Sequence, residues 1–424
     1  MNIDLKKGGL FFLAAFCSAT ACAEIEHDFG SHGYFRIGTG LSDGDASQET
    51  FKAPGAGSKY RLGNESDNYI ELDLYDTMSL SPDGAKIHVE SMAVINDNAE
   101  GKFDFNEISQ LYAEASNFTS ALGDPKVWIG RRYYDRHDIH INDFFFLNTL
   151  QGYDGGGISD IDMGSGKLAL AIGRKNADDD AATAFDESSL AQTRLDARYS
   201  DIKVNNNGAL TLWGTRDTSA GDKANNIEEL DGFAVGVMHT QKEFYGGFNK
   251  FMVQYGKGLG RHAGKGGLDA ATGKVTTAAN ASNFDDANTF RIVNSNVIEP
   301  SPNWGMMTSV VYEDIDSRDF DGTDQTWLSL GARPMWFVNK NFRVPLELGF
   351  DTVKDNANGT DGSVVKATLA AELALDRGFW ERPVLRAYTT HAKWSDDFKG
   401  QVGGETYAND TSGWTVGLQA ETWW

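Results

Sequence analysis

The sequence predicts an all-β chain that closes into an antiparallel transmembrane barrel of roughly 18 strands. Three observations predict it. Apolar and polar residues alternate with a period of two, long polar Gly-rich connections alternate with short turns, and residues 414–424 form one more alternating strand that ends on Trp424. The composition agrees, because 47 Gly and 12% aromatic residues against only 8 Pro are typical of many strands joined by tight turns.

The first 23 residues have the features of a secretory signal peptide. Lys6 and Lys7 precede an apolar run, and Ala21 and Ala23 supply small side chains at the −3 and −1 positions of a cut after residue 23. Both cysteines lie within this segment. Residues 24–424 therefore contain no cysteine and need no disulfide.

Residues 24–424 are strongly acidic. Subtracting Asp4, Lys6 and Lys7 from the whole-chain counts of 61 acidic and 38 basic residues leaves 60 and 36, a net charge of −24. This balance argues against nucleic acid as a partner, since a phosphate backbone needs a basic face, and it favours cations in any pore. No apolar run after residue 23 approaches the ~20 residues of a membrane-spanning helix. An exported chain of this kind is therefore soluble or crosses the outer membrane as a closed barrel.

Strand-length segments with period-2 alternation recur along residues 24–424. In residues 69–74, for example, isoleucine and leucine share one face while tyrosine and acidic side chains share the other. Dividing 401 residues (424 minus 23) by ~22 per strand and connection gives roughly 18 strands. The predicted segments include 34–38, 60–63, 69–74, 168–172, 195–199, 209–213, 233–239, 247–255, 307–313, 326–333, 342–350, 364–375, 384–391 and 414–424.

One connection does not read as an ordinary loop. Residues 135–157 carry Arg136, Asp138 and Asp143 beside three consecutive phenylalanines, and glycines 155–157 close the segment. An exposed loop rarely carries such an apolar patch, because it would aggregate or seek a partner. We expect this loop to fold into the lumen, with its charges toward the channel and its rings toward the wall, so that it narrows the pore.

The last strand shows the barrel pattern most clearly. In residues 414–424, Trp414, Val416 and Leu418 share a face apolar enough for lipid, whereas Glu421 and Trp423 lie on the other face. A secreted glycosidase would also use aromatic rings and paired carboxylates, but it would not need lipid-facing alternation through its last residue. We therefore expect a channel and not an enzyme.

Six blocks spread along residues 24–424 carry a resemblance to known proteins. They are HGYFRIG (32–38), SKYRLGNE (58–65), RRYYDRHDIHINDFFF (131–146), HTQ…GGFNKFMVQY (239–255), FWERPVLRAYTTHAKW (379–394) and the final ETWW. Together these blocks resemble the maltoporin family. That resemblance implies an 18-stranded antiparallel barrel with an inward-folded third loop, assembled as a homotrimer in the outer membrane of a Gram-negative bacterium. It also implies facilitated diffusion of maltose and maltodextrins, and bacteriophage binding at the external loops.

The resemblance also implies a binding site for sugar. Family members line the channel with a row of aromatic rings, which here would be Tyr34, Tyr69, Phe248, Trp380 and Trp423. The polar residues opposite, and the constriction, would be Arg36, Arg61, Glu71, Arg136, Asp138, Asp143 and Phe145. The alternation independently places Tyr34 with Arg36, Tyr69 with Glu71, and Trp423 with Glu421 on inward faces.

The sequence departs from the family at the constriction. Phe145 replaces a tyrosine, and Leu147 and Asn148 replace an aromatic–acidic pair. The sugar preference is therefore open: a channel for sucrose or a β-glucoside, or a less selective general porin, are the alternatives. We expect no cofactor and no metal, since His137 and His140 lack further convincing ligands and the Asp-rich segment 319–324 matches no defined Ca²⁺ loop.

Overall fold

The structure is a computed structural model that describes residues 25–65, 67–81, 84–97, 102–175, 191–221, 228–265, 278–318 and 324–424. The predicted signal peptide, residues 1–23, lies outside the described residues. No helix among the described residues is long and apolar enough to cross a membrane.

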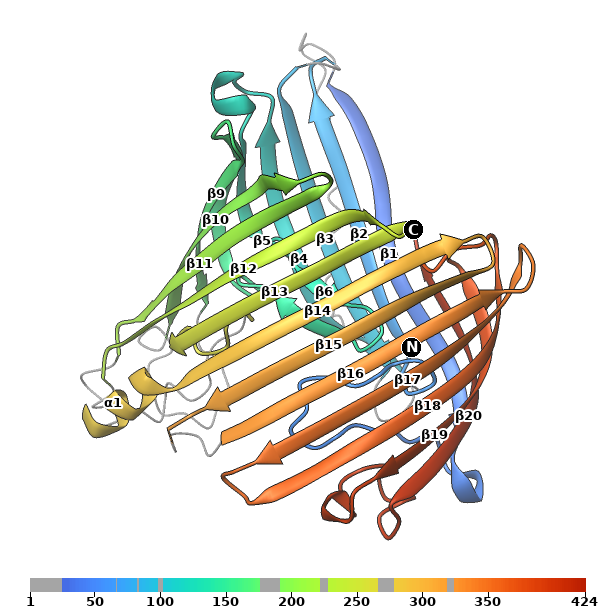
Figure 1. Cartoon of the computed structure of the whole chain (residues 1–424). Helices are drawn as coiled ribbons and strands as arrows, with labels where there is room; N and C mark the ends of the chain where they lie inside the picture. Colours follow the sequence, from blue (N-terminus) through green and yellow to red (C-terminus); the bar gives the residue numbers. More distant parts are fainter. Residues whose placement is uncertain are drawn as a thin grey trace, which may run out of the picture.

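Eighteen strands form one sheet that closes on itself, as predicted (Figure 1). Each strand pairs antiparallel with the next along the chain, and the last pairs with the first from Tyr34 opposite Trp423 to Leu41 opposite Val416. Closure leaves no unpaired edge, which is what a sheet in lipid requires. The wall strands are β1 (Glu26–Leu41), β2 (Tyr69–Ser79), β3 (Lys86–Asp97), β4 (Phe103–Ser116), β5 (Lys126–Arg131), β8 (Asp154–Asp162), β9 (Lys167–Lys175), β10 (Gln192–Asn205), β11 (Gly208–Ser219), β12 (Leu230–Phe244), β13 (Gly247–Gly258), β14 (Asn288–Ser301), β15 (Trp304–Asp316), β16 (Asp324–Phe337), β17 (Phe342–Asp355), β18 (Thr360–Ala374), β19 (Val384–Trp394) and β20 (Ser412–Trp423).

The period-2 pattern of the sequence becomes the two faces of this wall. Along β19 buried and exposed residues alternate without interruption from Val384 to Trp394. In β20, Val416 and Leu418 are exposed while Gln419 and Glu421 are buried. A soluble protein would not leave the apolar face in water, so the outer surface is the lipid-facing side.

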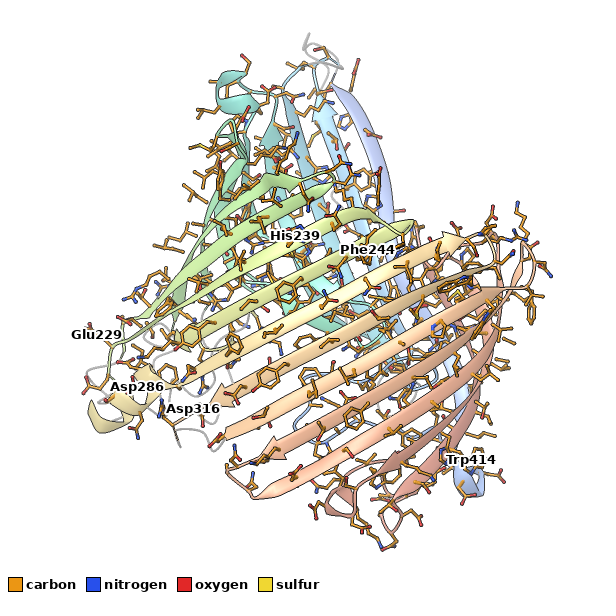
Figure 2. All side chains as sticks on the ribbon, in the orientation of Figure 1. Glu229, His239, Phe244, Asp286, Asp316 and Trp414 are labelled. Atoms are coloured by element: carbon orange, nitrogen blue, oxygen red, sulfur yellow. The ribbon has the colours of Figure 1, made fainter. Side chains whose placement is uncertain are left out.

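The two rims of the barrel differ in the length of their connections. Residues 206–207, 245–246 and 302–303 make short turns at one rim, whereas the connections 42–68, 132–153 and 395–411 belong to the other. Phe244 lies toward the short-turn rim, and Glu229, Asp286 and Asp316 lie together at the long-connection rim (Figure 2). The long rim also carries a nine-residue helix, α1 (Ala278–Asp286), inside a connection for which no helix is predicted. The part of the chain that the structure describes also contains the 3-10 turns η1 (Asp43–Asp45), η2 (Ala121–Gly123) and η4 (Asp396–Phe398).

Two of the long connections that the structure describes fold far into the barrel instead of standing outside it. The predicted inward loop is confirmed: β6 (His137–Ile139) lies behind β13 and β14, within the outline of the barrel (Figure 1). Its bounds differ from the prediction, because glycines 155–157 belong to the wall strand β8. The inward loop is therefore residues 132–153.

The second inward connection corrects a predicted strand. Residues 60–63 alternate like a wall strand but belong to the connection 42–68, which runs along the inner faces of β15–β20. The Leu62 N–H donates to Glu347 at 3.0 Å, and the Leu62 carbonyl accepts from Lys366 at 2.8 Å and from Thr368 at 2.9 Å. Wall side chains thus replace the partner strand, which satisfies the buried backbone groups without a ladder.

Candidate functional site

The loop 132–153 forms the centre of the lumen. Its middle is a small hairpin of β6 and β7 (Phe144–Leu147). Phe144 and Phe146 are 1% and 0% exposed, whereas Phe145 between them is half-buried. The loop therefore turns two rings into the packed interior and leaves the third closer to the channel.

Contacts to distant strands place this loop inside the barrel. The Phe144 ring packs edge-on against Trp327 of β16, with the ring centroids 5.1 Å apart. Gln254 of β13 donates a hydrogen bond of 2.7 Å to the Phe146 carbonyl. The backbone N–H of Arg61 donates at 3.0 Å to the carbonyl of Ile141. A loop that touches β13, β16 and the inner connection 42–68 together must occupy the lumen.

The five predicted aromatic residues come together as one row, and its first half follows the wall. The rings of Tyr69 on β2 and Tyr34 on β1 have centroids 6.1 Å apart. Tyr34 is the direct cross-strand neighbour of Trp423 on β20. Adjacent strands lie about 4.8 Å apart, so the row passes from β2 over β1 to β20 without a gap.

The second half of the row leaves the wall and crosses the lumen. The Trp423 ring lies 6.3 Å from that of Trp380, which belongs to the turn between β18 and β19. Trp380 in turn stacks on Phe248 of β13 at 6.4 Å, with an interplanar angle of 16°. Six strands separate β13 from β20 on one side of the closed sheet. The row therefore spans the lumen as well as lining it.

His140 of the inward loop packs against the two tryptophans in the middle of the row. Its ring centroid lies 5.3 Å from that of Trp380 and 5.8 Å from that of Trp423. Its two ring nitrogens lie 3.3 Å from the Arg382 guanidinium and 3.5 Å from the Arg61 guanidinium. Burial and the neighbouring guanidinium groups hold the pKa of His140 well below its usual value. The imidazole is therefore neutral and packs as a third ring.

Two predicted arginines border the wall half of the row. Arg36 and Arg61 each form an ion pair of 3.0 Å with Glu65. The Arg61 guanidinium donates at 2.7 Å to the hydroxyl of Tyr34, and that hydroxyl donates at 3.1 Å to Glu421. These contacts fix the Tyr34 ring and hold both guanidinium groups beside it.

Several charged residues of this site were not predicted as site residues. Glu421 receives ion pairs of 2.7 Å from Arg386 and 2.9 Å from Arg382. The Arg382 guanidinium also lies 4.1 Å from the centroid of the Trp423 ring. The period-2 alternation could have identified Arg386 and Glu421, because both occupy inward positions of strands. Glu65 and Arg382 lie in connections, where alternation carries no information.

The remaining predicted polar residues form two groups. Glu71 accepts a hydrogen bond of 2.9 Å from the Tyr69 hydroxyl at the β2 end of the row. On the inward loop, the Arg136 guanidinium lies between two rings, 3.7 Å from the centroid of Tyr133 and 4.7 Å from that of Phe145. Phe145 lacks the hydroxyl of the tyrosine that the family resemblance implies at this position. Its ring instead contacts the Arg136 guanidinium through a cation–π interaction.

The two loop aspartates are more accessible than the carboxylates of the buried ion pairs. The Asp143 side chain is 41% exposed and 3.9 Å from the Arg61 guanidinium. Asp138 is exposed and pairs with Phe145 in the β6–β7 ladder. Both carboxylates are therefore open to a solute, unlike Glu65 and Glu421.

This arrangement offers two kinds of contact side by side. The ring faces supply flat apolar surfaces at spacings of 6.1–6.4 Å, and the neighbouring carboxylates and guanidinium groups exchange charge-assisted hydrogen bonds. Such a surface suits a solute with apolar faces and a hydroxylated rim.

Two solved structures align with nearly the whole chain. OpdK of Pseudomonas aeruginosa, in a structure with vanillate, matches with 12% identity and a TM-score of 0.48 over 94% of this chain and 99% of that chain. OccK2 (OpdF) of the same organism matches with 11% identity and a TM-score of 0.50 over 93% and 97%. At this identity the likeness concerns the fold alone.

A comparison of the whole sequence with models of protein families identifies the family of this chain. The model of the LamB porin family matches residues 29–424, which is nearly the entire chain. Together with the closed 18-stranded wall, this match makes the chain a multi-pass protein of the outer membrane. The chain belongs to the LamB porin family.

Proposed function

We propose that this porin conducts maltose and maltodextrins by facilitated diffusion along the row Tyr69–Tyr34–Trp423–Trp380–Phe248. The observation that carries the proposal is the continuity of the row: its ring contacts are 6.1, 6.3 and 6.4 Å, and Tyr34 and Trp423 are cross-strand neighbours. A pyranose can stack on each ring through its C–H faces and move to the next ring.

The polar residues support the same proposal. The hydroxyl groups of a sugar can reach the exposed Asp143 and Asp138, and the guanidinium of Arg136 lies between Tyr133 and Phe145. Hydrogen bonds to charged groups are stronger than neutral ones, yet here they are few and solvent-accessible. The resulting site is weak and repeated.

Weak binding is what conduction needs. With an association rate constant of ~10⁶ M⁻¹s⁻¹, a site with a Kd of ~1 mM releases sugar about 10³ times per second, whereas a site with a Kd of ~1 nM would release it about once in a thousand seconds. A row of equivalent rings divides the binding energy over several positions and keeps each of them shallow.

Current blockade in planar bilayers tests the proposal. We expect millimolar maltohexaose to interrupt the ion current of single channels, with sucrose and a β-glucoside such as cellobiose blocking less. Stronger blockade by sucrose or cellobiose than by maltohexaose would mean that the channel conducts that sugar in preference to maltodextrins. No blockade by any of the three would make the protein a general porin and overturn the row as a sugar path. The predicted homotrimer and the bacteriophage contacts stay predictions.

A further inference from the structure

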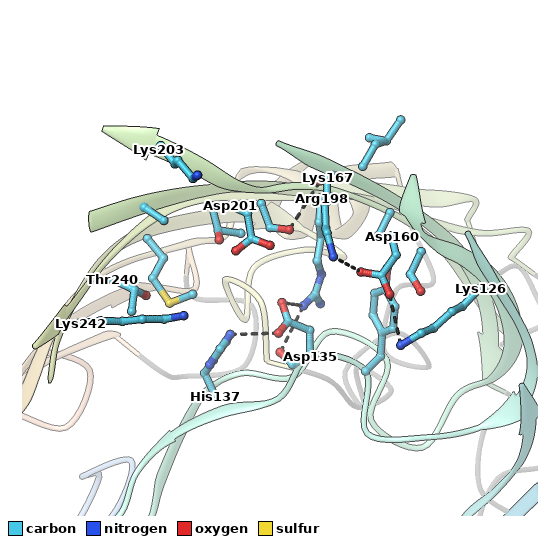
Figure 3. A pocket seen from close by; sticks show the side chains of 18 of the residues that line it. Lys126, Asp135, His137, Asp160, Lys167, Arg198, Asp201, Lys203, Thr240 and Lys242 are labelled. Atoms are coloured by element: carbon cyan, nitrogen blue, oxygen red, sulfur yellow. Dashed lines mark hydrogen bonds and ion pairs between the residues drawn. The ribbon is translucent and has the colours of Figure 1, made fainter. Parts of the chain in front are cut away.

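A cavity of about 970 Å³ lies in the lumen on the side of β4–β12, beyond the aromatic row. Its lining includes side chains of the strand ends at the short-turn rim and of the inward loop (Figure 3). A volume of this size matches the pockets that hold small organic ligands. The proposed sugar path does not use it.

The charge of the cavity is opposite to that of the chain. Its lining carries six basic residues, four lysines and two arginines, against four acidic residues, a net of +2. Two basic residues are neutralised by direct partners: Arg132 pairs with Glu114 at 2.8 Å and Arg198 with Asp135 at 2.6 Å. The lysines therefore decide the local potential, because a local cluster in a narrow lumen outweighs the average charge of the molecule.

Most of the lysine charge is uncompensated. Lys126 and Lys167 share one carboxylate, Asp160, at 3.3 and 3.2 Å, so that one positive charge remains. Lys203 and Lys242 are exposed, and among the described residues neither ammonium group has an ion pair or hydrogen bond. The opposing group is Asp201, an exposed carboxylate that lies in the cavity without a partner among the described residues (Figure 3).

The cavity adjoins the end of the aromatic row. Lys242 on β12 is the direct cross-strand neighbour of Phe248, and Thr240 is that of Lys250. The Lys250 ammonium lies 5.7 Å from the centroid of the Phe248 ring. Side chains directly opposite on an antiparallel pair lie about 5 Å apart, so a solute stacked on Phe248 lies within reach of Lys242.

We infer that this cavity is a binding site for an anionic group carried by a saccharide, a carboxylate or a phosphate, and that the channel prefers acidic sugars to neutral sugars of the same length. The inference rests on the proposed function and names a substrate class for it. The sugar rings occupy the aromatic row, while Lys203 and Lys242 receive the anion through charge-assisted hydrogen bonds.

The test compares two forms of one oligosaccharide. In one form the reducing end of maltohexaose is oxidised to a carboxylate, and in the other it is reduced to a primary alcohol. The two forms therefore differ only at C1, where one is negatively charged and the other is neutral. In 0.1 M salt we expect the oxidised form to block single channels with a Kd about tenfold lower. Maltose 1-phosphate and maltose form the corresponding pair for a phosphate group. A lower Kd for the anionic member of either pair supports the inference, and the pair that shows it identifies the anion as a carboxylate or a phosphate.

Variants separate this cavity from the rest of the channel. The double variant Lys203→Gln/Lys242→Gln should bring the ratio of the two constants close to one, and Lys203→Arg/Lys242→Arg should keep the preference. Lys340→Gln, in the short turn between β16 and β17 outside the cavity, is the matched control and should leave the ratio unchanged.

The outcomes distinguish the two proposals. Equal constants for the oxidised and reduced forms and for the phosphate pair in the wild-type channel, while neutral maltohexaose still blocks, would overturn the inference alone. A preference that survives in the Lys→Gln double variant would overturn it as well. Absence of blockade by every sugar would instead overturn the proposed function.

Discussion

The two sides of the lumen are built from the same kind of strand, but one is filled and the other is open. On the side of β15–β20 the connection 42–68 covers the wall, and the inward residues Glu347 and Lys366, which both bond to Leu62, are 0% and 3% exposed. On the side of β10–β12, Lys203 and Lys242 stand exposed toward the cavity. The aromatic row and His140 lie where the two sides meet. The wall strands therefore do not determine which part of the lumen is filled. The connections that fold inward determine it.

The filled side should be far more sensitive to the loss of a charge. Glu347 joins Arg333 and Lys366 and also accepts the N–H of Leu62 from the inner connection. Glu347→Gln leaves two buried cations without their carboxylate, so we expect a loss of about 3–5 kcal/mol in the free energy of unfolding. Heat-modifiable migration of the folded barrel in detergent measures the shift. Asp201→Asn, an unpaired carboxylate on the open side, is the control, and equal effects would erase the distinction between the two sides.

Overfilling the packed side should displace the inner connection. The Tyr60 ring lies against Gly331 and Gly349, where a Cβ would overlap it, and its hydroxyl bonds to Ser309 and Ser329 at 3.2 and 2.9 Å. We expect Gly349→Val to cost about 1–3 kcal/mol by overpacking and to raise the single-channel ion conductance as the segment moves. Ala332→Val, on the outward phase of β16, should leave the conductance unchanged. Unchanged conductance in both variants would mean that the segment does not restrict ions.

The row at the boundary should lose sugar affinity one ring at a time. Trp423→Ala removes the ring that links Tyr34 to Trp380, so we expect the Kd of maltohexaose to rise about tenfold, or ~1.4 kcal/mol. Current-noise analysis in planar bilayers measures the constant. Trp414→Ala alters the outward face of the same strand, where the ring is 41% exposed, and should not change it. Equal constants for both variants would mean that sugar does not use the row.

The boundary should also respond to acid through His140. Its pKa is held well below that of an unfolded histidine, about 6.5, so below that pH the unfolded chain binds a proton that the folded barrel does not. Stability should therefore fall by about 1 kcal/mol between pH 7.5 and 5.5 on account of this residue. His140→Gln should lack that part of the pH dependence in urea titrations of the folded band. An identical slope in both proteins would show that His140 titrates normally.

Much of the wall was predictable because alternation reports which residues face lipid. The same signal places Tyr34, Tyr69 and Trp423 inward, and the triple phenylalanine identifies the inward loop. The signal fails for residues 60–63, since a segment lying on the inner wall also alternates between two environments. Its backbone is satisfied by Glu347, Lys366 and Thr368, which local sequence cannot show.

The site was predictable where strands carry it and not where connections do. Trp380 lies in a turn, where no period-2 alternation tells which way a side chain faces. Only the family resemblance therefore identifies it as a site residue. Glu65 and Arg382 gain their roles from partners on β1 and β20, far away in the sequence. The cationic cavity is likewise assembled from lysines on separate strands, and the acidic total of the chain points in the opposite direction.

A structure of the barrel determined with maltohexaose tests the central claim most directly. We expect glucose units stacked in sequence on Tyr34, Trp423, Trp380 and Phe248, along the boundary between the filled and the open side. Sugar bound only within the open cavity, with those four rings uncovered, would contradict it.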